Sequence, residues 1–280
     1  MPVYNDGIRI KLAGLLLTQL LLPGFVLLAQ SQADLYRRQA LEHVQKKQWT
    51  AAVENYAKAA ELEPNDALTH YNLALALKYG GDSRQAAEQF QKALLLKPDW
   101  AEAHFALGAV YYELKDQPAA LRELRAAIQY DDRNAGAHYF LGVILIDRKE
   151  FDAAISELRR TLALQPSHFE ARYTLALAYL QTDNPSGAIE ELRRSIQAKP
   201  GSVEAHYNLG LALGQTGDLP SAASEFRRAI ALDAKFAPAH SRLGITLRRT
   251  GDAEGALAEF QQTVRLTPGD AEAHYNLGSA

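Results

Sequence analysis

The chain repeats itself every 34 residues, and this period limits its fold more than any other feature of the sequence. Counted from Ala33, the register continues without insertion through seven complete units, and an eighth begins at Ala271 and runs to Ala280. The complete units span residues 33–66, 67–100, 101–134, 135–168, 169–202, 203–236 and 237–270. A period of this size predicts an elongated architecture in which each unit packs only on its neighbours.

Small and large residues alternate at fixed positions of the unit. Alanine occupies the twentieth position of all seven complete units, and leucine occupies the seventh position from the second unit onward. The eighth position is always small, as Ala40, Ala74, Gly108, Gly142, Ala176, Gly210, Gly244 and Gly278. The twenty-fourth position is large, as Tyr56, Phe90, Leu124, Leu158, Leu192, Phe226 and Phe260. On helices this alternation allows two antiparallel elements to approach closely, so we expect each unit to be a helix pair.

Turn signals divide each unit into two helices. Glycine-containing segments, such as those at 80–82, 216–218 and 250–252, suit the end of a first helix. The thirty-second position is proline in five units, as Pro64, Pro98, Pro166, Pro200 and Pro268, where proline ends a second helix. The abundance of Ala, Leu, Glu, Gln and Arg also favours helix over strand.

These spacings resemble those of the tetratricopeptide repeat (TPR), a helix-turn-helix unit, over about nine tenths of the chain. The chain departs from the family pattern at the fourth position, which is mostly histidine, and in the first unit, where Gln39 and His43 replace apolar residues. A polar terminal unit is expected where no neighbour covers it. The resemblance implies an all-α, right-handed superhelix, or solenoid, of seven complete helix-turn-helix units and a partial eighth over residues 33–280.

The first thirty residues differ from the repeats and indicate export. Arg9 and Lys11 precede eighteen residues without charge, 12–29, after which the chain becomes polar. A basic start, an apolar centre and a small residue before a polar stretch are the parts of a secretory signal peptide. The stretch also nearly reaches the roughly 20 residues that span a bilayer.

We therefore expect residues 1–29 to be a signal peptide cleaved after Ala29 or, as an alternative, an uncleaved anchor in the inner membrane. Residues 30–32 are then a linker, and the repeats lie in the periplasm or outside the cell. A third alternative, a buried first helix of a cytosolic domain, fits less well because the stretch has no polar face.

Composition and motifs exclude several classes of function. A net charge of -3 provides no basic excess for nucleic acid, and the absence of cysteine excludes disulfides and thiolate chemistry. The sequence contains no HExxH, Gly-x-Ser-x-Gly or Walker motif. We expect no enzymatic activity and no cofactor.

The resembled family lines its concave surface with the first helix of each pair. Carried over by position, the fifth residue of each unit faces inward and is mostly aromatic, and the ninth is mostly apolar. Arginines lie near both ends of this surface, with Arg242, Arg248 and Arg249 near one of them. The candidate groove residues are Tyr71, Asn72, Lys78, Phe105, Tyr139, Tyr173, Tyr207, Asn208, Arg248, Tyr275 and Asn276. An alternative is that the tyrosines pack against the neighbouring helix and serve stability.

Six histidines share the fourth position of their units, as His70, His104, His138, His206, His240 and His274, and Arg172 takes this position in the fifth unit. Zinc requires ligand nitrogens at about 2.0–2.1 Å, whereas packed helices lie about 8–10 Å apart. We therefore expect these histidines to pack within the fold and not to bind metal.

Together these features predict a non-enzymatic scaffold that binds a peptide or a partner segment in its concave groove and assembles an envelope or exported complex. An alternative is the targeting arm of a larger enzyme, a transferase or peptidase, with its catalytic domain beyond residue 280. The eighth unit stops before its second helix, so we expect the sequence to be a fragment of a longer protein.

Overall fold

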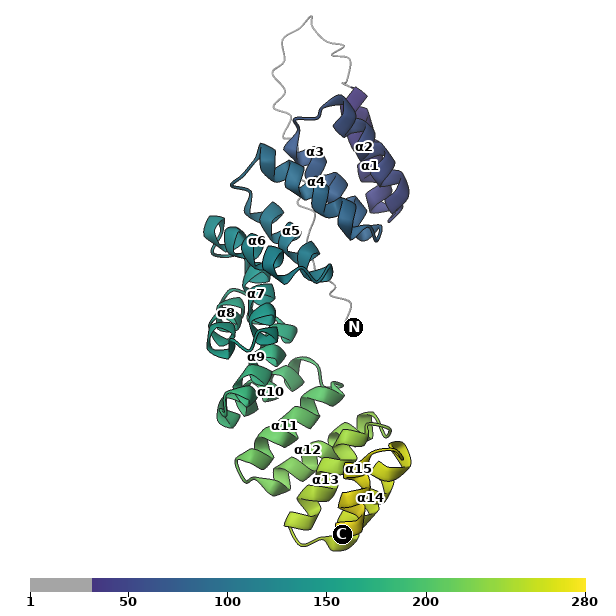
Figure 1. Ribbon diagram of the computed structural model, residues 1–280, viewed down its shortest axis with the longest axis vertical. Coiled ribbons are helices and arrows are strands. Elements are labelled where there is room, and N and C mark those ends of the chain that lie inside the picture. The colour runs from purple at the N-terminus through teal and green to yellow at the C-terminus, as the bar shows by residue number, and fades with distance from the viewer. Residues whose placement is uncertain (1–31) are drawn as a thin grey trace, which may run out of the picture.

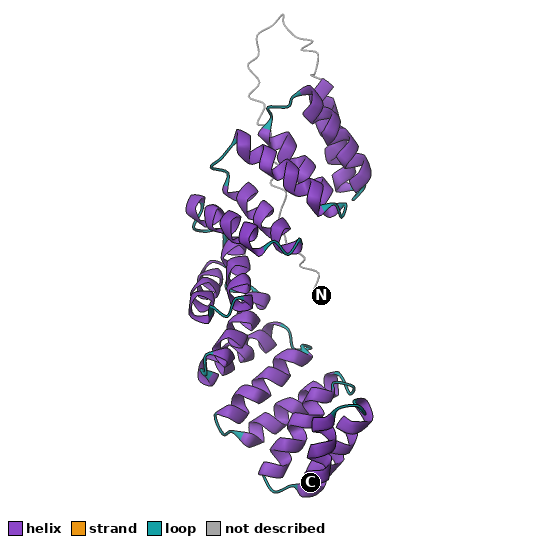
Figure 2. Cartoon of the chain, viewed as in Figure 1, coloured by secondary structure: helices purple, strands orange, loops and turns teal. Residues whose placement is uncertain are grey.

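The computed structural model describes residues 32–280, and all regular structure in this range is α-helical (Figure 2). The first helices of the units are α1 (Gln32–Gln45), α3 (Ala67–Tyr79), α5 (Ala101–Glu113), α7 (Ala135–Asp147), α9 (Phe169–Gln181), α11 (Val203–Gln215), α13 (Ala237–Arg249) and α15 (Ala271–Ser279). The second helices are α2 (Trp49–Leu62), α4 (Ser83–Leu96), α6 (Gln117–Tyr130), α8 (Phe151–Leu164), α10 (Pro185–Ala198), α12 (Leu219–Leu232) and α14 (Ala253–Leu266). The predicted all-α fold and its helix pairs are confirmed.

The predicted signal or anchor segment, residues 1–29, lies outside the described residues, as do residues 30 and 31 of the predicted linker. None of the helices between residues 32 and 280 has the length and apolar character needed to cross a membrane.

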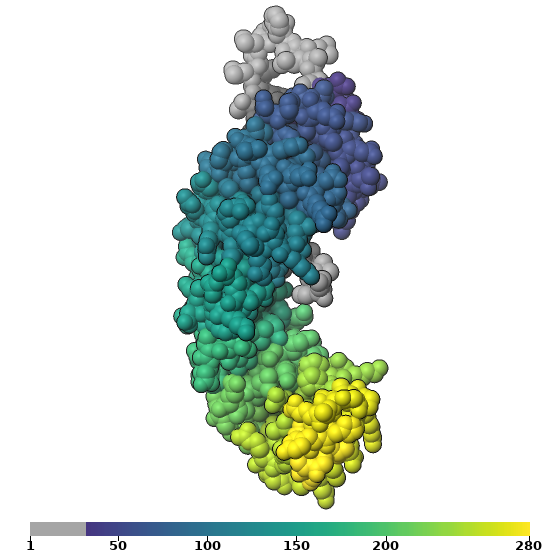
Figure 3. All heavy atoms as spheres, in the orientation of Figure 1, coloured from purple at the N-terminus to yellow at the C-terminus, as the bar shows by residue number. Residues whose placement is uncertain are grey.

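The helix pairs stack into a curved superhelix (Figure 1). Each helix packs on its partner and on the next helix along the chain, from α1 to α15. Successive first helices also approach one another directly, α5 with α7, α7 with α9, α9 with α11 and α11 with α13. The first helices therefore lie on the inner side of the curve, which is open on one side of the molecule (Figure 3).

The small and large positions meet in the core of each pair as the sequence predicts. All seven alanines at the twentieth position are fully buried, and the large side chains at the twenty-fourth position are at most 5% exposed. A methyl group added to Gly210 would lie 2.6 Å from the ring of Phe226, and one added to Gly244 would lie 2.7 Å from that of Phe260. At Gly278 an added methyl group meets nothing within 4 Å among the described residues.

The turn within each complete unit combines a left-handed residue with a helix cap. The residue before the cap has positive φ in every unit, and it is glycine at Gly81, Gly217 and Gly251. In most units the next residue, such as Asp82 or Asp218, accepts a hydrogen bond from a backbone N–H of the second helix. Three residues separate the two helices in every complete unit, so the helix pairs have similar geometry.

The fourth-position histidines connect three segments. In His104, Nδ1 lies 2.8 Å from a carboxylate oxygen of Glu123 on the second helix, and Nε2 lies 2.9 Å from the carbonyl oxygen of Pro98 in the preceding unit. The same pair of contacts recurs at His138, His206 and His240, with Glu157, Glu225 and Glu259 as the carboxylates. The prediction that these histidines pack within the fold is confirmed for His70, His138, His206 and His240, which are each only 6% exposed. His104 is half-buried, and His274 on α15 is exposed.

In the fifth unit an arginine makes the same connection. Arg172 donates to Glu191 at 2.6 Å and to the carbonyl oxygen of Pro166 at 2.6 Å. Carboxylate and carbonyl oxygens only accept hydrogen bonds, so a histidine here satisfies both partners when both of its nitrogens carry protons. A histidine ring with both nitrogens protonated and an arginine guanidinium therefore make equivalent hydrogen bonds in this position.

The environment of His104 favours its charged form. Burial disfavours the charge, but the hydrogen bonds to Glu123 and Pro98 and the Glu123 charge outweigh it, so the pKa of His104 is raised. Burial likewise opposes ionisation of Glu123, but hydrogen bonds from His104 and Arg122 outweigh it and lower the pKa of this carboxyl. Both pKa shifts favour the charged forms of His104 and Glu123, which together connect α5 to α6.

Two glycines on α11 are expected to respond in opposite directions to alanine. Gly210→Ala places a methyl group against Phe226, and overpacking of this kind costs about 1–3 kcal/mol. The methyl group added in Gly214→Ala meets nothing within 4 Å. Replacing a glycine inside a helix by alanine stabilises the folded protein by about 0.8–1.0 kcal/mol. Thermal unfolding followed by circular dichroism measures both, and shifts of the same sign would contradict the assigned packing.

A pH series tests the histidine connection. Because the pKa of His104 is higher in the folded chain than in the unfolded chain, its contribution to stability is complete below the ordinary histidine pKa of about 6.5 and is lost as pH rises through the raised value. His104→Arg, which copies Arg172, should melt progressively higher than the wild-type protein as pH increases. In a Glu123→Gln background this pH-dependent difference should vanish, and its persistence there would refute the assignment.

Candidate functional site

The inner face is the side of the first helices that carries the fifth and ninth positions. Among its apolar residues, Leu75 is buried, whereas Val143, Leu177, Leu211 and Ile245 are half-buried. The side chains of this face are held on helices that are fixed by the core behind them. The inner face is therefore a rigid and mainly apolar surface.

Two of the predicted aromatic residues of the fifth position pack where one unit meets the next. Tyr71 stacks on Trp100 with 4.5 Å between ring centroids, and Tyr207 lies 5.3 Å from Phe236. Each partner ring belongs to the last residue of the same unit, directly before the next first helix. These aromatic side chains are half-buried, so each combines a packing contact with a surface that reaches the inner face.

Burial also alters the tyrosine hydroxyls. It raises the pKa of Tyr71 to about 12, with smaller contributions from Glu102 and Tyr79. Burial and the Glu204 carboxylate raise the pKa of Tyr173 against the hydrogen bond that Asn208 donates to its hydroxyl at 2.8 Å. Both hydroxyls keep their protons at neutral pH and remain hydrogen-bond donors.

The other predicted aromatic residues occupy different environments. Phe105 packs against the backbone of Gly136, where an added methyl group would lie 2.7 Å from the ring. Tyr139 lies with its ring 4.7 Å from that of His168. Tyr275 on α15 is 73% exposed. The fifth-position aromatic side chain is thus exposed to solvent in the eighth unit.

The predicted polar residues do not gather at one point. Asn72 borders a small hollow near α1 and α2, and Lys78 forms an ion pair with Glu113 at 3.3 Å. Asn208 lines a larger hollow, which is described below. Asn276 is buried, and its side-chain nitrogen has no hydrogen-bond partner within the described chain. Arg248 donates to the hydroxyl of Ser279 at 2.6 Å and lies over the ring of Phe260.

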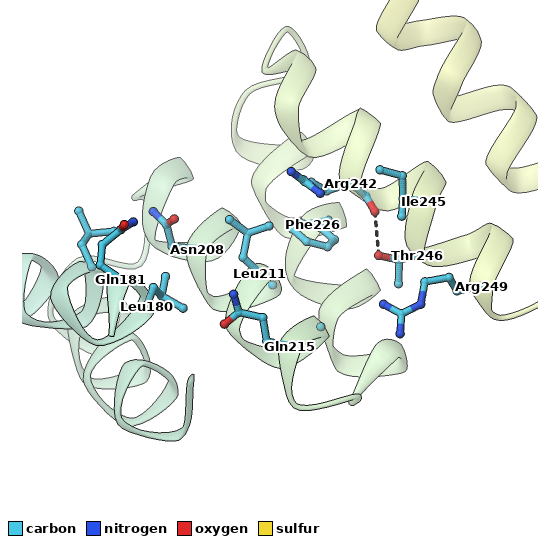
Figure 4. Close-up of a pocket in the computed structure, with 13 residues that line it drawn as sticks. Leu180, Gln181, Asn208, Leu211, Gln215, Phe226, Arg242, Ile245, Thr246 and Arg249 are labelled. Atoms are coloured by element: carbon cyan, nitrogen blue, oxygen red, sulfur yellow. Dashed lines mark hydrogen bonds between the residues drawn. The ribbon is translucent and has the colours of Figure 1, made fainter. Parts of the chain in front are cut away.

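A hollow of about 510 Å³ opens on the inner face between α9, α11 and α13 (Figure 4). Its apolar floor consists of Leu177, Leu180, Leu211 and Ile245. The ring of Phe226 lies between α11 and α13 (Figure 4). The polar lining of the hollow includes Gln181, Gln215, Asn208, Arg242 and Arg249. A concave apolar surface with a few polar groups is the usual form of a ligand site.

Gly214 leaves this hollow open. It occupies the twelfth position of its unit, where the preceding units carry Tyr112, Ile146 and Leu180. A methyl group added to Gly214 would meet nothing within 4 Å, so glycine is not needed here for close packing. The sequence signal for this residue is the change from a large side chain to glycine at the twelfth position of the sixth unit.

Of the three arginines that the sequence places near this end of the groove, two line the hollow. Arg248 is turned towards α15, whereas Arg242 and Arg249 line the hollow and are exposed. Neither Arg242 nor Arg249 forms an ion pair with a residue between 32 and 280, and no carboxylate lines the hollow. Nothing in the described range places three or more histidine or acidic side chains where they would hold a metal ion.

The helix-pair architecture has close counterparts among solved structures. The chain is similar to YrrB, described as a TPR protein with an unusual peptide-binding site, at 22% identity and a TM-score of 0.64, over 68% of this chain and 97% of YrrB. It is similar to PilF of Pseudomonas aeruginosa at 23% identity and a TM-score of 0.63, over 76% of this chain and 97% of PilF. The MamA protein matches at 23% identity and a TM-score of 0.56, over 61% of this chain and 94% of MamA. These likenesses show a shared fold.

No curated protein sequence matches the chain. Two family sequence models do. One, described as tetratricopeptide repeat, matches residues 117–169, 147–203, 173–235 and 241–280, and a second, described as TPR repeat, matches residues 40–80 and 76–115. These matches cover most of the helical range. The chain therefore belongs to the tetratricopeptide repeat family, whose members are generally non-catalytic scaffolds for protein interaction.

Proposed function

We propose that the chain is a scaffold that binds a peptide or partner segment along its inner face. The observation that carries this proposal is the hollow between α9, α11 and α13 on the accessible side of the curve. It presents an apolar floor and two guanidinium groups that form no ion pair within residues 32–280. Half-buried aromatic side chains flank it, and Tyr173 and Asn208 provide fixed polar groups beside it. The similar protein YrrB is itself described as having a peptide-binding site.

The rigidity of this surface suits binding of a flexible segment. The first helices are held by core contacts to the second helices and by the histidine connections between units. A preformed surface loses little conformational entropy when a ligand binds, so the ordering cost falls mainly on the partner. The second helices, on this account, support the inner face, and of these helices only α12 contributes to the lining of the hollow, through Phe226.

Site-specific photo-cross-linking tests which face binds. A photoreactive amino acid in place of Leu211 on α11 should cross-link a partner from envelope extract of the source organism. The matched control is Leu95 on the second helix α4, which is 81% exposed and far from the inner positions of α11 in the sequence. We expect a discrete cross-linked species from position 211 only. Equal or stronger capture from position 95 would refute binding at the inner face.

We also propose that the scaffold acts outside the cytoplasm, in an envelope or exported complex. The support is the order of a basic start, a charge-free stretch at 12–29 and a polar continuation in the sequence. Fusion of residues 1–40 to alkaline phosphatase, which folds to an active enzyme only after export, should give phosphatase activity in cells. Replacing Leu16 and Leu20 by arginine in the fusion should abolish it. An inactive unsubstituted fusion that is expressed normally would contradict export.

A further inference from the structure

We infer that the hollow between α9, α11 and α13 binds an acidic peptide segment that places one large apolar side chain over Gly214. This inference rests on the proposed function and names the chemistry of its ligand. Three features of the hollow carry it: a helical glycine without a packing role, an apolar floor, and two guanidinium groups without an ion-pair partner between residues 32 and 280.

Gly214 supplies the first argument. Glycine within a helix is destabilising by about 0.8–1.0 kcal/mol relative to alanine, and here no neighbouring atom requires it. The eighth-position glycines of the complete units each face a large side chain, as Gly210 faces Phe226. Gly214 instead faces open space above Leu211 and Ile245. Glycine at position 214 therefore leaves room for a side chain of the bound peptide.

The floor of the hollow determines what kind of side chain fits. Leu177, Leu211 and Ile245 present apolar surface that is only half-buried. Covering such surface with a leucine or phenylalanine side chain removes apolar area from water on both partners, which favours association. A polar or small side chain would leave the floor exposed. The geometry thus selects a large apolar anchor.

The charges determine what flanks the anchor. Elsewhere on the first helices cationic side chains have partners in the chain, as Arg37 does with Asp34 and Glu63, and Lys78 with Glu113. Arg242 and Arg249 have no ion-pair partner among residues 32–280, and they lie at opposite ends of the α13 segment that borders the hollow (Figure 4). Guanidinium groups form strong paired hydrogen bonds with carboxylates, so a ligand with two carboxylates complements this rim.

The spacing of the two arginines sets the spacing of the carboxylates. Arg242 and Arg249 are seven residues apart on one helix, which places their Cα atoms about 10 Å apart along the axis. In an extended peptide every second side chain points to the same face and rises about 6.6–6.8 Å from the last. An acidic residue, a spacer, a large apolar residue, a spacer and a second acidic residue place the two acidic side chains two such steps, about 13 Å, apart, with the anchor between them. The flexible arginine side chains span the remaining difference of about 3 Å, so both carboxylates lie within their reach.

Fluorescence anisotropy with synthetic peptides tests this ligand. The probe carries glutamate, serine, leucine, serine and glutamate in that order between glycine-serine flanks, and matched probes replace both glutamates by lysine or the leucine by alanine. We expect the acidic probe to bind at least about tenfold more tightly than either matched probe at low salt. Its affinity should fall as salt increases. Equal binding of the acidic and lysine probes would overturn the inference.

Protein variants locate the binding. Gly214→Leu fills the hollow and should weaken the acidic probe by at least about tenfold while the melting temperature stays equal or rises. Arg242→Gln combined with Arg249→Gln should weaken it by a similar factor and remove most of the salt dependence. Arg248→Gln is the matched control on α13, because Arg248 is already engaged by Ser279, and should leave binding unchanged. Unchanged binding in either the filled or the uncharged variant overturns the inference.

The outcomes separate this inference from the proposed function. Cross-linking through position 211 without preference for the acidic probe would leave the scaffold role standing and show that the ligand chemistry is wrong. Cross-linking through position 95 alone would remove the scaffold role on the inner face itself. Self-association of the protein that is lost in Gly214→Leu, with no binding of the acidic probe, would assign the hollow to a second copy of the chain and overturn the peptide ligand.

Discussion

The contact between a small residue at the eighth position and a large apolar side chain at the twenty-fourth governs the rest of the structure. A methyl group added to Gly108, Gly142, Gly210 or Gly244 would lie 2.8 Å or less from the facing side chain. The two helices of a unit are therefore held at a separation that a small residue permits. Because this contact recurs in every complete unit, the units share one shape, and stacking them produces a regular curve with the first helices inside.

The curve divides the molecule into a supporting part and an accessible part. The second helices contribute the large core side chains and the carboxylates that hold the fourth-position histidines, as Glu157 holds His138. These contacts connect each unit internally and to the carbonyl oxygen of the unit before it, so the first helices are fixed without using their inner side. The inner face is left free to differ between units, which is where Gly214, Arg242 and Arg249 depart from their neighbours.

The fold was predictable from the sequence because it depends on local, repeated signals. The period, the eighth and twenty-fourth positions and the prolines each act within one unit, and the structure confirms the helix pairs that they predict. The site was less predictable because it depends on side-chain direction and on joints between units. The sequence does not show that Arg248 turns to Ser279 while Arg249 borders a hollow, nor that Tyr71 and Tyr207 stack on the last residue of their units. It also does not show which carboxylate meets each histidine until the pair is folded.

Methyl NMR spectroscopy of the isotope-labelled protein tests most directly the claim that the inner face binds while the second helices support it. On titration with the acidic probe, the account predicts that the methyl signals of Leu177, Leu211 and Ile245 shift together and reach saturation. The methyl signals of Leu95 and Leu257, which are exposed on the second helices α4 and α14, should stay unchanged. Saturable shifts of Leu95 or Leu257 without shifts at the hollow would contradict the account.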